Sequence, residues 1–131
     1  MIRNLAFAAA VSVLGTTPAF AGESNDICPD MAVDARGRAC IRQLLSYSEQ
    51  SLTTMWRFVF AKFGGSGDPS GRALLAEQRA WIAFKDKACG LYFLPGLSAM
   101  EWSNGQRCKI RLIDNRTVAL DEMQRDFPGE D

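Results

Sequence analysis

The side chains that most often perform chemistry in proteins are scarce in this chain. It contains no histidine, which removes the usual general base, the usual activator of a serine or cysteine nucleophile and the commonest metal ligand. The cysteines do not form a paired C-x-x-C metal motif. Two carboxylates could still act as acid and base, but the acidic residues lie mostly on faces predicted to be exposed. The residue types therefore predict a protein without catalytic residues, metal or cofactor.

The N-terminus has the pattern of a secretory signal peptide. Arg3 supplies the positive charge, residues 5–15 form an apolar stretch, and residues 19–21 read Ala-Phe-Ala, a small-x-small cleavage site. The apolar stretch is too short to span a bilayer. We therefore expect cleavage after Ala21, a single mature domain over residues 22–131, and a periplasmic or secreted location without membrane insertion.

Export places the four cysteines in an oxidising compartment, where pairing is the default. Four cysteines allow three connectivities, and the sequence alone does not choose among them. We favour Cys28–Cys40 and Cys89–Cys108, since each pair closes a short loop without crossing the other. A loop of about 15 residues gains roughly 3 kcal/mol in the chain-entropy model, which matters for a domain of this size.

The charge balance gives no general attraction to nucleic acid or anionic membrane. Without Arg3, the 15 basic residues become 14, against 15 acidic ones. Acidic residues do gather near the C-terminus, where they include Asp121, Glu122 and Asp126. Such a run is typical of a solvated helix end. The alternative is an acidic patch for a basic partner, and we keep Asp121 and Glu122 as candidate partner-binding residues.

Apolar residues recur at helical spacing through most of the chain. The first pattern begins at Arg38 and continues to Phe63, where a glycine-rich stretch over residues 64–67 ends it. Asp68 is then a suitable N-cap, and Pro69 suits the first position of a second helix.

The second helix is predicted to continue to about Phe93, before Pro95 and a glycine break it. A loop is expected as far as Gly105, and a third helix from there until shortly before Pro128. No strand pattern of useful length appears. The sequence therefore predicts an all-α fold, a small antiparallel bundle of three main helices stapled by two disulfides.

Polar residues occupy several positions where helical periodicity predicts a core. Gln78 and Lys85 fall on the apolar stripe of the second helix, and Arg116 shares a face with leucines four residues before and after it. An unpaired buried charge is costly, so Gln78 and Asp86 are the expected partners of Arg116. We interpret Gln78, Lys85, Asp86 and Arg116 as a network that fixes helix register; a ligand-binding role is the alternative.

The predicted loop between Cys89 and Cys108 is unusually apolar for a surface connection. Its candidate partner-binding residues are Leu97, Ser98, Met100, Glu101 and Trp102. Exposed Trp and Met are enriched at binding hot spots, and a disulfide at the loop's base would order it before binding. The alternative is that the loop folds back as a lid over the helix ends.

The second and third predicted helices resemble the LprI-type lysozyme-inhibitor family in residues and spacing. The matching positions are Leu74 or Leu75, Gln78, Arg79, Trp81, Lys85, Asp86, Cys89, Cys108, Arg116 and Leu120, with Cys40, Glu49, Leu52 and Trp56 upstream. The resemblance covers roughly residues 28–123. Departures are Lys85 for Arg, Thr53 for Asn, Ile113 for Thr, and Leu97 inside a small-residue turn.

This resemblance implies an exported helical protein that inhibits lysozyme by binding it. Inhibition would mean occluding a cleft that holds two carboxylates, with residues 97–102 as the plug and the acidic C-terminal helix attracting a cationic enzyme. The alternative is a periplasmic structural or interaction module without inhibitory activity. The expected partner is a protein, and the resemblance implies lysozyme; the sequence does not predict the oligomeric state.

Overall fold

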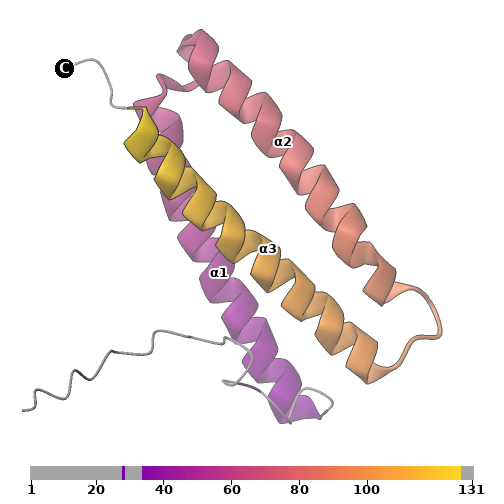
Figure 1. Ribbon diagram of the computed structural model, residues 1–131. Helices are drawn as coiled ribbons and strands as arrows, with labels where there is room; N and C mark the ends of the chain where they lie inside the picture. The colour runs from indigo at the N-terminus through magenta and orange to yellow at the C-terminus, as the bar shows by residue number, and fades with distance from the viewer. Residues whose placement is uncertain (1–27, 29–33, 128–131) are drawn as a thin grey trace, which may run out of the picture.

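The computed structural model describes residue 28 and residues 34–127, and the predicted signal peptide lies outside these residues. Three long helices dominate the described residues, which contain no strand (Figure 1). The helices are α1 (Ala35–Lys62), α2 (Pro69–Gly90) and α3 (Ala99–Asp126), with short 3-10 helices η1 (Gly65–Gly67) and η2 (Leu91–Phe93). The all-α prediction is confirmed. Among the helices of the described ranges, none combines the length and apolar character needed to cross a bilayer.

Successive helices run antiparallel, so α1 and α3 point the same way (Figure 1). Ile41 packs with Ile110 near the starts of α1 and α3, and Lys62 Nζ lies 3.3 Å from Gln124 Oε1 near their ends. The α3 helix packs mainly along α1 and less closely on α2, and α1 and α2 touch each other only slightly. The pair of α1 and α3 is therefore the centre of the bundle.

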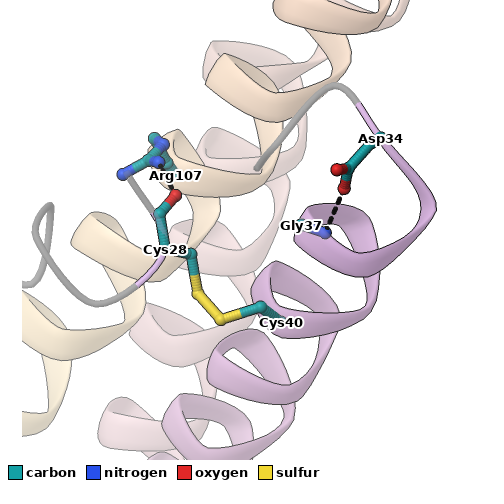
Figure 2. Close-up of a disulfide and its surroundings, with 5 residues drawn as sticks. All are labelled: Cys28, Asp34, Gly37, Cys40 and Arg107. Atoms are coloured by element: carbon teal, nitrogen blue, oxygen red, sulfur yellow. Dashed lines mark hydrogen bonds between the residues drawn. A yellow bond between two sulfur atoms is a disulfide. The ribbon is translucent and has the colours of Figure 1, made fainter. Parts of the chain in front are cut away.

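Side-chain caps determine where the helices begin. The Asp68 carboxylate accepts a hydrogen bond from the Ser70 backbone at 2.7 Å, with Pro69 in the first turn of α2, as predicted. Asp34 accepts from the Gly37 backbone at 2.7 Å, so α1 begins at Ala35, slightly before the predicted Arg38 (Figure 2). Such caps are each worth about 1 kcal/mol.

The predicted start of the third helix near Gly105 is wrong, because α3 already begins at Ala99. Ser98 and Glu101 form a capping box there, and the Ser98 backbone donates to Glu101 Oε2 at 3.1 Å. The box supplies partners for backbone groups that the first helical turn leaves unpaired. The α2 helix ends at Gly90 and does not continue to about Phe93 as predicted. Residues 91–93 form the 3-10 helix η2.

The core consists of two clusters at opposite ends of the bundle. The first cluster contains Cys28, Ile41 and Ile110, and the second contains Val59, Leu74 and Leu120. Disulfides join Cys28 to Cys40 and Cys89 to Cys108, both toward the end where α1 and α3 begin. Figure 2 shows the first of them, with Arg107 donating to the Cys28 carbonyl at 2.8 Å. Both disulfides therefore lie toward the end of the first cluster, whereas the end with the second cluster is held by apolar packing and by the Lys62–Gln124 hydrogen bond.

Candidate functional site

The buried Arg116 of α3 is held by side chains of α2. Its guanidinium is 7% exposed; Nε donates to Gln78 Oε1 at 2.8 Å, and Nη1 donates to Glu77 Oε1 at 2.8 Å. Nη2 contacts the other Glu77 oxygen, so the carboxylate is gripped at both oxygens. The guanidinium also lies 5.8 Å from the centre of the Trp81 ring. We call Arg116, Glu77, Gln78 and Trp81 the Arg116 network.

Asp86 does not pair with Arg116, contrary to the expectation from sequence. Its carboxylate pairs instead with the neighbouring Lys85 at 2.8 Å, and its side chain is 60% exposed. Asp86 lies eight residues beyond Gln78, which is about 12 Å along the helix and out of reach. Sequence reasoning missed Glu77, although its place beside Gln78 puts it within reach of the same guanidinium.

The connection from α2 to α3 exposes several apolar side chains, and we call Leu91, Tyr92, Leu94, Leu97 and Met100 the apolar tip. Leu91 is 68% exposed, Leu94 56% and Met100 53%. Gly96 adopts a left-handed conformation with φ of 86°, which lets the chain turn back into α3. The tip carries no charge between residues 91 and 100, so an apolar surface faces solvent at the end of the bundle.

The other loop residues predicted to bind a partner have structural contacts instead. Trp102 is half-buried against the first cluster, and the Arg42 guanidinium lies 5.9 Å from its ring centre. Ser98 and Glu101 are engaged in the capping box. Among the loop residues predicted to bind a partner, only Leu97 and Met100 are large apolar side chains exposed to solvent.

The base of the apolar tip is held rigidly against α3. A Cβ at Gly105 would lie 2.5 Å from the Phe93 ring and 2.8 Å from the Tyr92 Cβ, so only glycine allows η2 to approach this closely. Lys109 Nζ lies 4.6 Å from the Phe93 ring centre. The Cys89–Cys108 disulfide closes the same segment. These contacts fix the base of the tip against α3, and a base that is already fixed lowers the entropy lost on binding.

Asp121 and Glu122 lie near the C-terminal end of α3, away from the apolar tip. Asp121 pairs with Arg125 at 2.8 Å, and Glu122 is exposed. From Met100 to Glu122 the helix rises about 33 Å, several times the Debye length of about 8 Å in physiological salt. The structure therefore does not bring the apolar tip and the acidic residues into one surface. Within the described ranges, no three acidic or sulfur side chains come together as metal ligands.

Comparison with known proteins identifies one relationship. A protein-family model described as "Lysozyme inhibitor LprI" matches residues 28–120. This range holds both disulfides, the Arg116 network and the apolar tip, and excludes the acidic pair at 121 and 122. No curated protein and no solved structure matches the chain at a significant level.

Proposed function

The chain belongs to the lysozyme inhibitor LprI family, and from this membership we propose that it is an exported, non-catalytic protein that blocks the cleft of a lysozyme or a related cell-wall hydrolase. The apolar tip is the feature that carries this proposal. The tip lies at one end of the bundle, where α2 turns into α3 (Figure 1), and its leucines and Met100 are exposed and available to fill a cleft. Its family supplies the class of partner.

The chemistry of the apolar tip suits such a cleft. The catalytic cleft of a glycoside hydrolase contains two carboxylates, and burying a further negative charge beside them would cost both desolvation and repulsion. Residues 91–100 bring no charge. The tip would therefore exclude water and substrate by apolar contact. Trp102, which packs on the first cluster, would hold the start of α3 in place next to the tip.

The acidic residues of α3 have a smaller part in this proposal. Because Glu122 lies about 33 Å from Met100 along the helix, it stays outside the contact made by the tip. Asp121 and Glu122 would then act only through long-range attraction of a cationic enzyme, which physiological salt screens. Replacing both by their amides should change the inhibitory concentration by less than about twofold at that salt concentration.

The test is a lysis assay with purified mature protein, several classes of lysozyme and a cell-wall suspension. The unaltered protein should slow lysis at micromolar concentration. Met100→Asp should raise the half-inhibitory concentration more than about tenfold, since a charge would be buried in the contact. Val118→Asp is the matched control, because Val118 lies on the same helix, is 55% exposed and is remote from the tip.

Two results would count against the proposal in different ways. If no lysozyme class is inhibited, the protein is an envelope interaction module, which is the alternative function. If lysis is slowed equally by the Met100 and Val118 variants, inhibition is real and the tip is not the contact.

A further inference from the structure

A groove separates α1 from α2 along the side of the bundle. Both helices pack on α3, and the space between them has a volume of about 630 Å³. Its apolar lining is Leu52 and Trp56 from α1, Leu75, Trp81 and Ile82 from α2, and Ile113 from α3. Ile82 is 43% exposed on the α2 wall, and Trp56 and Trp81 are only half-buried. The groove therefore leaves apolar side chains of two helices open to contact.

The two walls of this groove carry opposite charges. Glu49 stands on the α1 wall, and Arg79 and Lys85 stand on the α2 wall. Lys85 is paired with Asp86. Within the described part of the chain, the Glu49 carboxylate and the Arg79 side chain make no hydrogen bond or ion pair. Glu49 and Arg79 are both exposed to water, so each wall offers a charge that a facing surface of opposite sign would attract.

We propose that this groove is the interface of a two-fold symmetric dimer of the chain. A two-fold axis parallel to the helices lays the α1 wall of one copy over the α2 wall of the other. Each Ile82 then meets the α1 wall of the other copy, and each Glu49 stands on the wall opposite the Arg79 of the other copy. In this isologous interface both copies use the same surface, so the contact between Glu49 and Arg79 occurs twice. A single partner helix would need its own pattern of opposite charges to do the same.

This dimer is independent of the proposed function. The groove runs along the side of the bundle, while the apolar tip lies at its end, where α2 turns into α3. None of the residues that line the groove belongs to the tip. Both tips therefore remain accessible in the dimer, and loss of dimerisation would leave cleft occlusion by a single copy intact.

The first test measures the mass of the mature protein by analytical ultracentrifugation over a series of concentrations. We expect a concentration-dependent dimer, and a change in tryptophan emission as Trp56 and Trp81 lose water. Ile82→Asp should give a monomer at every concentration. Phe84→Asp is the control, since Phe84 lies on the same helix, is 56% exposed and does not line the groove. Circular dichroism establishes that both variants fold.

The second test reverses the charges one at a time and together. Glu49→Arg and Arg79→Glu should each weaken dimerisation about tenfold or more, because each places like charges opposite one another twice. A mixture of the two variants should form a heterodimer, since every facing pair is again opposite in sign. The double variant should recover the homodimer for the same reason.

Three results would overturn the proposal. One is a monomer at all concentrations of the unaltered protein, which would leave the groove to a different partner. Another is a dimer that persists in the folded Ile82→Asp variant. The third is a mixture of the charge-reversal variants that stays monomeric although each variant is folded.

Discussion

The Arg116 network and the apolar tip depart in opposite ways from the usual rule that apolar residues are buried and charges are exposed. Arg116 is a charge in the core, and it is fully engaged by Glu77, Gln78 and Trp81. The tip is an apolar surface in solvent, and Leu91 and Met100 are more than half exposed. A group whose partners lie inside the same molecule serves the architecture. A group left without partners is available for recognition.

The Cys89–Cys108 disulfide joins α2 to α3 between the Arg116 network and the apolar tip. Its removal should cause the largest combined loss of stability and inhibition among the changes described below. In the double variant Cys89→Ser/Cys108→Ser, the free energy of unfolding should fall by about 3 kcal/mol, because the unfolded chain regains loop entropy. Inhibition of lysozyme should fall as well, since the tip loses the link at its base. Urea denaturation and the lysis assay measure the two effects.

The matched control is Cys28→Ser/Cys40→Ser. This variant removes the disulfide at the start of α1, which does not link the two ends of the segment that carries the apolar tip. Its stability should fall by a similar amount, about 3 kcal/mol, while inhibition per folded molecule is retained. Equal loss of inhibition in both variants would show that the tip does not depend on its own disulfide.

Replacing Arg116 should damage stability without damaging recognition. Arg116→Met leaves the buried Gln78 without its partner, whereas Glu77, whose side chain is 51% exposed, returns to water. The free energy of unfolding should therefore fall by about 2 kcal/mol, less than for a fully buried pair. Arg111→Met, at an exposed position of α3, should change it by less than about 0.5 kcal/mol. Lost inhibition in a folded Arg116→Met variant would assign the network to recognition after all.

A smaller change tests how the tip is held. The added methyl group of Gly105→Ala would meet Phe93 at 2.5 Å, so η2 must shift away from α3. Stability should fall by about 1–2 kcal/mol, and inhibition should weaken because the tip moves. Gly90→Ala is the control, since a Cβ there meets nothing within 4 Å. Gly105→Ala should melt at a lower temperature and inhibit lysis less than Gly90→Ala. Identical behaviour of the two variants would mean that Gly105 does not position the tip.

Local signals were sufficient for most of the fold. Periodicity over the long helices, the Asp68–Pro69 start and the glycine-rich turn predicted the three helices, because each signal acts within a few residues. The start of α3 was also readable from Ser98 and Glu101, whose spacing is that of a capping box. Pro95 and Gly96 favour a loop that continues to about Gly105, and this expectation conflicts with the capping-box spacing.

Local sequence patterns specify the helices, the polar positions on their faces and the uncharged stretch between the second and third helices. Which of these positions meet depends on the packing of the helices. This packing paired Arg116 with Glu77 and left Asp86 with Lys85, because the pairing depends on the axial offset of two antiparallel helices. It buried half of Trp102 while exposing Met100, and it separated the apolar tip from Asp121 and Glu122. Contacts between distant segments depend on how whole helices pack, and helical periodicity specifies only which face of a helix is buried.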